Sequence, residues 1–294
     1  MIKRFNPPVR ITLTIIIYFI SMFSCLGIFA AFHAVNRLKT DYGFLAFGNI
    51  VVGIILSGAV FLAYRFFDKG KPLQLGFSFK KKDLGFMFVV MIVSIFVAVA
   101  FIWGISERND LGTHYHFSKL KNGSYLLLIM LGCIGWLIGT LHEEVLNRGY
   151  FFANLHQLGF AWMFLTSNLI FSITHIPTKG FHPIELLIHI VTGIGYGYVY
   201  YKSGSLWLST IVHGFHNFLL DILFNNDYSV TLVTFSTQLT DANKLVQQSI
   251  LVSFILLITY LFYGKNGAFT PAKNLAQLWK KESNSLSNQN HVEV

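Results

Sequence analysis

Residues 122–148 read NGSYLLLIMLGCIGWLIGTLHEEVLNR. The first 21 positions of this stretch contain no charged residue, and Glu143, Glu144 and Arg148 then follow within seven positions. A helix that crosses the hydrocarbon core of a bilayer needs about 20 mostly apolar residues. A second uncharged run, 149–178, comes directly afterwards. The stretch therefore predicts a transmembrane helix whose three charges lie inside the membrane.

The same pattern extends over most of the 294-residue chain, of which 54% is hydrophobic and only 12% charged. Soluble domains carry about 25% charged residues, which excludes a water-soluble enzyme, a disordered protein and a nucleic-acid-binding module. Because long segments in lipid satisfy their main-chain hydrogen bonds only as helices, we predict an all-α polytopic membrane protein with about eight transmembrane helices. The uncharged runs are 11–36, 42–64, 84–106, 122–142, 149–178, 186–201, 203–220 and 245–264.

Lys and Arg in the loops predict the orientation. With a cytoplasmic N-terminus, 14 of these residues lie on the cytoplasmic side and seven on the other, leaving out Arg148. Both termini are therefore predicted to be cytoplasmic, in the cell membrane. We expect one transmembrane domain, 1–263, followed at 264–294 by a cytoplasmic interfacial helix (Pro271–Lys281) and a disordered polar tail.

Ionisable groups inside transmembrane helices cost several kcal/mol and indicate function. Here they gather in three predicted helices, as Glu143-Glu144-x-x-x-Arg148, Phe171-x-x-x-His175 and His213-x-x-x-Asn217. Residues four apart share a helix face, so Glu144 and Arg148 can form a buried ion pair while Glu143 points elsewhere. At 1.5 Å per residue, Glu143, His175 and His213 lie ~18, ~22 and ~12 Å from the cytoplasmic helix ends. These comparable depths predict that the three motifs converge.

In order, spacing and helix placement, the three motifs resemble those of the CPBP family of intramembrane proteases (CAAX proteases and bacteriocin-processing enzymes, also called the Abi family). The chain is therefore also similar to the type II CAAX prenyl endopeptidases. The resemblance covers roughly 122–222, and includes Ser203-Gly204-Ser205-Leu206-Trp207 before the third motif. It implies an intramembrane endopeptidase. Eukaryotic relatives act on prenylated CAAX proteins, and bacterial relatives are linked to bacteriocin immunity, pheromone processing and cleavage of membrane proteins.

Amide hydrolysis needs an activated water, donors for the oxyanion and a proton for the leaving amine. We assign Glu143 as the base, because a carboxylate in a low-dielectric site binds a proton more readily than in water. His175 would hold the water. His213 and Asn217 would donate to the oxyanion, as the resemblance also implies. Glu144, Arg148 and Phe171 are predicted to be structural, with the Glu144–Arg148 pair orienting Glu143 and the Phe171 ring packing under His175.

Two assignments stay open at this point. His216 lies three residues after His213, so a rotation of the helix could present it instead. Glu185 and His189 form a further pair, on the sixth predicted helix, which we interpret as packing or cavity lining.

A metal site is the alternative chemistry. Glu143, His175 and His213 would suit a catalytic Zn²⁺ with one open position. The sequence His142-Glu143-x-x-Leu146 lacks the second histidine of a zincin helix. The spacing does not separate a metalloprotease from a glutamate-dependent protease. We favour the metal-free mechanism, which requires no cofactor, because the neutral donor Asn217 suits an oxyanion hole.

The predicted function is thus an intramembrane endopeptidase that hydrolyses a membrane-associated protein or peptide, with a cavity between the fourth, fifth and seventh helices that is open to the cytoplasm. Its partners are this substrate and the lipid bilayer, and no nucleic acid is expected. The alternative is a non-enzymatic transporter or regulatory scaffold. A transporter would show internal repeats around the polar site, and none is seen. A scaffold should have lost part of the motif set.

The topology can be tested with reporter fusions after Lys121 and after Lys281. The loop asymmetry predicts that the two positions lie on opposite sides of the membrane, with Lys281 in the cytoplasm. Equal reporter signals at both positions would contradict the predicted topology.

Overall fold

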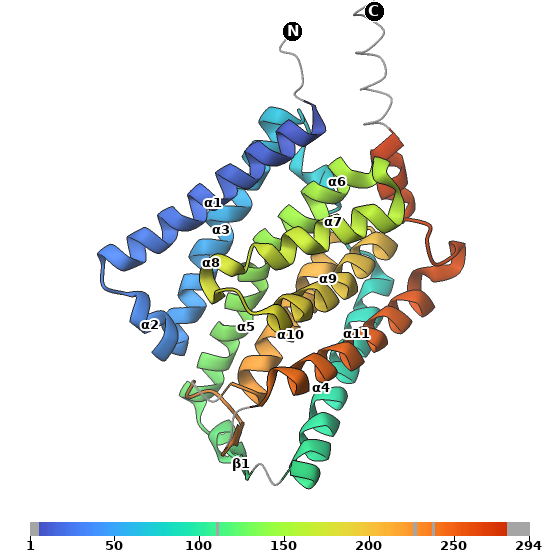
Figure 1. The fold of residues 1–294 in the computed structure, drawn as a ribbon. Helices are drawn as coiled ribbons and strands as arrows, with labels where there is room; N and C mark the ends of the chain where they lie inside the picture. The colour runs from blue at the N-terminus through green and yellow to red at the C-terminus, as the bar shows by residue number, and fades with distance from the viewer. Residues whose placement is uncertain (1–5, 110–111, 226–227, 237–238, 281–294) are drawn as a thin grey trace, which may run out of the picture.

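The structure, a computed structural model, describes residues 6–109, 112–225, 228–236 and 239–280. It is almost entirely helical, which confirms the predicted fold class (Figure 1). The helices are α1 (Pro7–Ala31), α2 (Val35–Thr40), α3 (Tyr42–Phe67), α4 (Lys81–Asn109), α5 (Gly123–Glu144), α6 (Phe151–Leu155), α7 (Gly159–Ile173), α8 (Ile176–Lys179), α9 (Pro183–Ser203), α10 (Leu206–Leu223) and α11 (Asp241–Tyr263).

Shorter elements connect these helices. Two strands, β1 (Thr113–Tyr115) and β2 (Val233–Phe235), form a small antiparallel pair. Turns of 3₁₀ helix lie at Pro72–Leu75, Phe117–Lys121, His156–Leu158 and Gly264–Asn266, and a π-helical segment lies at Val145–Tyr150.

Near the C-terminus, residues 273–280 are helical and overlap the predicted interfacial helix. Its place at the membrane surface stays a prediction. The predicted tail, 282–294, lies outside the described residues.

Six helical segments within the described residues are long and apolar enough to cross a membrane, against the eight spans predicted. The difference has two causes. One segment, Gly123–Ile173, contains both α5 and α7, which the chain reversal at Gly159 separates. The other cause is α9, which is not among the six and carries Glu185, His189, Thr192 and Lys202. The chain is a multi-pass membrane protein, and about eight remains an approximate count.

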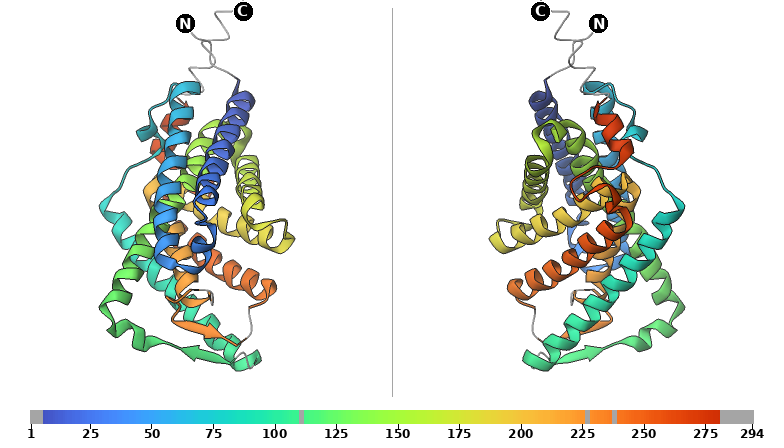
Figure 2. Two further views of the ribbon diagram at one scale, coloured as in Figure 1. Left: turned by 90° about the vertical axis from the view of Figure 1, so that its left-hand side faces the viewer. Right: turned by 90° about the vertical axis from the view of Figure 1, so that its right-hand side faces the viewer.

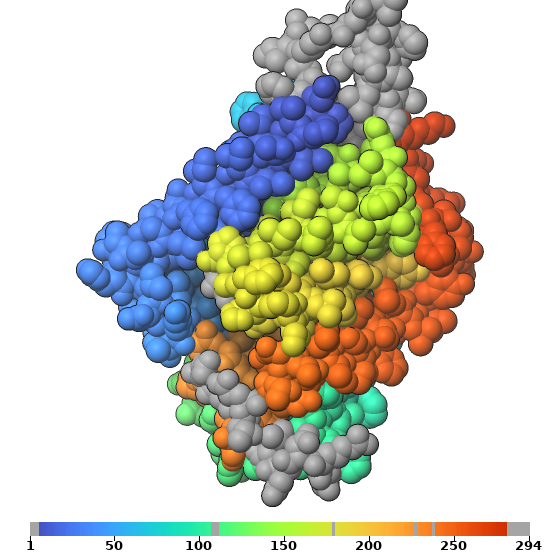
Figure 3. Space-filling view, viewed as in Figure 1, coloured from blue at the N-terminus to red at the C-terminus, as the bar shows by residue number. Residues whose placement is uncertain are grey.

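The start of α1 and residues 273–280 lie at one end of the molecule, and β1 and β2 lie at the other (Figures 1 and 2). In the middle stands α10, which contacts α4, α5 and α9. Within its span 72% of the residues are buried inside the protein, against 22% for α1. In the space-filling view α9 and α11 lie side by side in front of α10 (Figure 3). The helix that carries His213 is therefore the most enclosed span.

Glycines allow α3 and α5 to approach closely. A Cβ atom added at Gly53 would overlap the main-chain oxygen of Ile138, and one added at Gly135 would lie 2.8 Å from the main chain of Ala46. Small residues at helix contacts allow this backbone approach in membranes, where dispersion replaces the hydrophobic effect. The contact fixes α5, and with it the two adjacent carboxylates at its end.

We predict that Gly53→Ala destabilises the protein by about 1–3 kcal/mol, because the added methyl group must push the two main chains apart. Gly58→Ala on the same helix is the matched control, since a Cβ atom there meets nothing within 4 Å. Thermal unfolding in detergent measures both variants. Equal unfolding temperatures for the two would show that close α3–α5 contact is not needed.

Candidate active site

The two carboxylates lie where the helix changes its geometry. Regular α-helix ends at Glu144, and the π-helical segment begins at the next residue. Here the Phe151 amide bonds to the carbonyl of Leu146, five residues earlier. Single π-helical turns occur frequently at functional sites. The side-chain amide of Asn147 donates through Nδ2 to the main-chain oxygen of Glu143 at 2.8 Å. This hydrogen bond fixes the backbone at Glu143.

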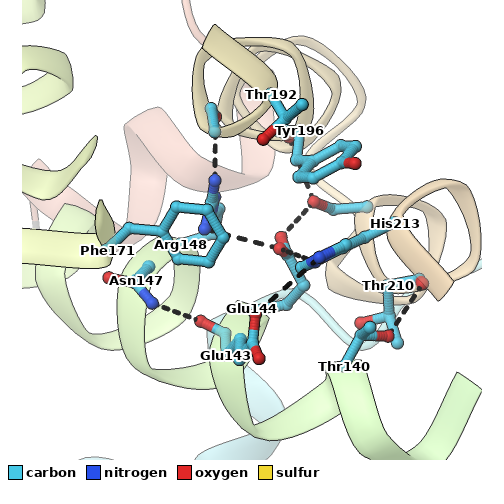
Figure 4. A network of polar contacts seen from close by, with 12 residues as sticks. Thr140, Glu143, Glu144, Asn147, Arg148, Phe171, Thr192, Tyr196, Thr210 and His213 are labelled. Atoms are coloured by element: carbon cyan, nitrogen blue, oxygen red, sulfur yellow. Dashed lines mark hydrogen bonds and ion pairs between the residues drawn. The ribbon is translucent and has the colours of Figure 1, made fainter. Parts of the chain in front are cut away.

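Glu144 and Arg148 form a completely buried ion pair. Arg148 Nη1 lies 3.4 Å from Glu144 Oε1, and neither side chain has exposed surface. Arg148 Nη2 donates to the Gly193 carbonyl of α9 at 2.8 Å (Figure 4). Its guanidinium also lies 4.6 Å from the centre of the Phe171 ring. The predicted ion pair is thus present, and it connects α5, α7 and α9.

The Glu144 carboxylate also holds α10. Ser209 donates its hydroxyl to Glu144 Oε2, and His213 Nδ1 lies 2.9 Å from Oε1 (Figure 4). We expected the Glu144–Arg148 pair to orient Glu143. Instead the carboxylate of Glu144 contacts His213. Adjacent residues point about 100° apart on a helix, so the two carboxylates reach different nitrogens of the same imidazole, Glu144 at Nδ1 and Glu143 at Nε2.

His175 is held at the end of α7. Its Nδ1 lies 2.8 Å from the main-chain oxygen of Phe171, which accepts the hydrogen bond. The Phe171 ring meets the imidazole edge-on, with centroids 4.9 Å apart at 79°, rather than packing flat beneath it. On its other side His175 stacks on His189 of α9, with centroids 3.9 Å apart at 20°. The ring orientation of His175 is therefore fixed by three contacts.

The structure brings Glu143, His175 and His213 together. Glu143 Oε2 lies 3.9 Å from His175 Nε2 and 3.7 Å from His213 Nε2. These distances are too long for direct hydrogen bonds, and they leave room for a water to bridge the groups. Each imidazole uses its Nδ1 proton elsewhere, so a neutral ring presents a lone pair at Nε2. Glu143 Oε2 and a neutral His175 Nε2 are therefore both acceptors, and a water placed between them would supply the two donors that they lack.

These three groups line a cavity of about 560 Å³ together with Asn217. Asn217 lies one helical turn beyond His213 on α10. Phe171 forms part of the same wall. The predicted catalytic residues thus share one cavity, although no contact joins Asn217 to His213 within the described residues.

The direction of the cavity differs from the expectation. Its lining extends to Asp221, Phe235 and Lys244, where α10 ends and α11 begins. This end of the molecule lies opposite the start of α1 (Figure 1). A cavity that reaches this end does not agree with both cytoplasmic termini and a cytoplasmic opening. The spacing of residues along a helix predicts their depth in the membrane. It does not predict towards which end of the molecule a cavity between several helices extends.

A metal ion fits this arrangement less well than water does. Tetrahedral zinc with bonds of about 2.0–2.1 Å holds its ligand atoms about 3.3 Å apart. The corresponding separations from Glu143 are 3.7 and 3.9 Å. Among the described residues, no group of three or more His, Cys, Asp or Glu side chains is arranged to hold a metal. We therefore derive no step that passes through a metal.

Sequence reasoning missed several supporting residues. Ser209 precedes His213 by four positions, so its place on the same helix face was available as a signal. Tyr196, His189 and Gly193 lie on α9, where only the pairing of His189 with Glu185 was noted. A Cβ atom at Gly193 would lie 2.4 Å from Asn168 Oδ1 and 3.2 Å from Arg148 Nη2, so the side chains packed here need a glycine. No sequence signal shows that a glycine faces a particular arginine.

Comparison with known families agrees with this geometry. Residues 124–219 match the family described as type II CAAX prenyl endopeptidase Rce1-like. The match confirms the predicted resemblance, and at the level of the family it supports a protease. It includes all three motifs and ends before α11. No match was found among curated proteins.

We predict that Arg148→Ala destabilises the protein by about 3–5 kcal/mol, because it leaves the buried Glu144 carboxylate without its cation. Arg37→Ala is the matched control. Arg37 has the same four-residue spacing from its partner Asp41, but the two side chains are 62% and 46% exposed. Such exposed pairs contribute about 0–1 kcal/mol. Chemical or thermal unfolding measures the difference, and an Arg148→Ala protein as stable as Arg37→Ala would contradict the assignment.

Proposed function

We propose that the protein is an intramembrane endopeptidase that uses Glu143 to activate water. One observation carries the proposal: Glu143 Oε2 lies within 4 Å of the Nε2 atoms of two imidazoles at the wall of a cavity. A positioned carboxylate next to a bridging water is the arrangement that general-base hydrolysis requires. The family match supports this reaction class.

In this proposal one O–H of the water donates a hydrogen bond to His175 Nε2, and Glu143 removes the proton of the other O–H. The hydrogen bond from His175 Nδ1 to the Phe171 carbonyl leaves Nε2 as the acceptor. Stacking on His189 keeps that nitrogen directed at the water. The resulting hydroxide attacks the carbonyl carbon of the substrate, and the proton held by Glu143 then passes to the leaving amine.

His213 and Asn217 are proposed to stabilise the oxyanion. Asn217 donates from its amide as it stands. His213 can donate from Nε2 only when both of its nitrogens carry protons, since Nδ1 already donates to Glu144. With Glu143 and Glu144 ionised, Arg148 and a protonated His213 would leave the cluster without net charge. The buried ion pair is thus compatible with a donor at the oxyanion position.

The substrate is proposed to be a membrane-associated protein or peptide. The cavity wall combines aromatic side chains such as Trp136 and Phe235 with polar groups such as Asn225 and Gln247. Such mixed walls suit a peptide that leaves the bilayer. If both termini are cytoplasmic, as we propose from the loop charges, the cavity extends towards the non-cytoplasmic side. The peptide would then approach from the end of the molecule where β1 and β2 lie.

We predict that Glu143→Gln lowers proteolysis of a reconstituted membrane peptide by at least about 10²-fold, because the amide keeps the shape but does not accept the proton. His175→Ala and His213→Ala should lose a comparable amount. The double variants should be scarcely worse than the single ones, since the groups act as one unit. Glu185→Gln, at the cavity wall but outside the three motifs, is the matched control and should stay within about threefold of the wild type.

Two measurements complete this test. Crosslinking to the peptide should show that Glu143→Gln still binds it, which separates catalysis from binding. Metal analysis and chelation decide the mechanism: stoichiometric zinc that restores lost activity would overturn the metal-free proposal. Full activity in Glu143→Gln would remove the enzyme assignment and favour a scaffold.

A further inference from the structure

His216 is the titratable residue of the third motif region that the proposed mechanism does not use. It lies one turn beyond His213 on α10, is 3% exposed and lines the same cavity. Among the described residues no ion pair joins it to Glu143, whereas both His175 and His213 lie within 4 Å of that carboxylate. Its Nδ1 instead hydrogen-bonds to the hydroxyl of Tyr196 from α9. The sequence left open which of the two histidines faces Glu143. The structure places His213 there, and His216 contacts Tyr196 instead.

Tyr196 contacts both histidines of α10. Its ring stacks on the imidazole of His213, with centroids 4.2 Å apart and planes at 18°. Its hydroxyl reaches His216 (Figure 4 shows the ring beside His213). The residue is 1% exposed. Because the hydroxyl is tied to His216, the ring cannot turn away from His213 without breaking that hydrogen bond.

The stacking supplies a constraint that the Glu144 bond does not. A hydrogen bond at His213 Nδ1 fixes one point of the imidazole, yet the ring can still tilt about its side-chain torsion, which has a broad energy well. A parallel aromatic ring against one face restricts that tilt. The edge of Phe171, 5.9 Å away at 78°, limits the ring from another direction. The direction of His213 Nε2 towards Glu143 therefore depends on Tyr196.

The cavity wall continues to α11. Gln248 and His216 both line the cavity, and the Gln248 side-chain amide donates to Gln247 Oε1 at 2.8 Å. These two glutamines are 3% and 4% exposed within a membrane-spanning helix. Polar groups in that setting need partners inside the protein. In this way α11, outside the residues that match the family, supplies polar side chains to the same cavity.

We propose that Tyr196 and His216 are positioning residues for His213. This inference rests on the proposed function, because it states that Tyr196 and His216 hold the His213 imidazole in the orientation that the proposed reaction needs. Tyr196 and His216 transfer no proton in it. They hold the imidazole in the orientation at which its Nε2 faces the substrate.

The first test compares cleavage by purified variants in detergent. Tyr196→Leu removes the stacking ring and should lower kcat by about 10–100-fold, because small misplacements of catalytic groups cost up to about 10² in rate. KM should change by less than about twofold. Tyr198→Leu is the matched control: the same change on the same helix, where the Tyr198 hydroxyl contacts the Ala268 carbonyl away from the cavity. It should leave kcat unchanged.

The second test is a double-mutant cycle that keeps the ring. Tyr196→Phe and His216→Leu each break the same hydrogen bond, so each should lower kcat to a similar degree, by about three- to tenfold. The double variant should match the single ones within about twofold. If the loss of kcat in the double variant equals the product of the losses in the two single variants, the two residues act independently and the proposed link between them is wrong. His216→Gln, which can still bond to the hydroxyl, should recover most of the activity.

A third readout does not depend on activity. In protein labelled with ¹³C at the histidine ring, the His213 resonance, assigned by its loss in His213→Gln, should move in Tyr196→Leu and stay in place in Tyr198→Leu. If the wild-type protein does not cleave the peptide, or if Glu143→Gln is fully active, the proposed function is wrong. The shift of the His213 resonance in Tyr196→Leu would still show whether Tyr196 packs against His213. An unmoved resonance with kcat within twofold of the wild type would overturn the positioning role. A change in KM alone would also overturn it, and would assign Tyr196 to substrate binding.

Discussion

A carboxylate without any exposed surface, Glu144, constrains the rest of this structure. Removing a charge from water carries a penalty of several kcal/mol, which is offset only when good partners surround it. Arg148, Ser209 and His213 all contact this carboxylate, and they come from the π-helical segment and from α10. The position of α10 relative to α5 is therefore set by the need to satisfy one buried charge. The imidazole that faces Glu143 is fixed by the same requirement.

The cation of this pair imposes a second constraint, on α9. Arg148 donates to a main-chain oxygen at Gly193 and lies over the face of Phe171, so both helices must approach it closely. The polar groups of α9 follow from its place between this arginine and the cavity. Tyr196 stacks on the imidazole of His213, and His189 stacks on that of His175. A helix that serves the site in this way cannot also be uniformly apolar, which explains why α9 does not have the composition of a membrane span.

The sequence predicted the all-α class and the convergence of the three motifs, because charge-free runs and four-residue spacings are local properties. It predicted the Glu144–Arg148 pair for the same reason. It did not predict that Glu144 contacts His213, since that contact depends on how α10 rotates against α5. The π-helical segment and the stacking of Tyr196 were missed because both result from packing between helices far apart in the chain. The reach of the cavity to the start of α11 could not be predicted, because it depends on how all the helices pack.

The hydrogen-bonding state of the two imidazoles connects this packing to chemistry. Each ring donates its Nδ1 proton to a fixed acceptor, the Phe171 carbonyl for His175 and the Glu144 carboxylate for His213. Those acceptors were placed by the fold, so the fold determines which nitrogen faces the cavity. With His175 neutral, two acceptor atoms, Glu143 Oε2 and His175 Nε2, then face each other across a gap of 3.9 Å, and His213 Nε2 lies 3.7 Å from the same carboxylate. Such a group is unfavourable when dry, and a molecule with protons to share relieves it. The packing that satisfies Glu144 thus creates, at Glu143, a position that selects water.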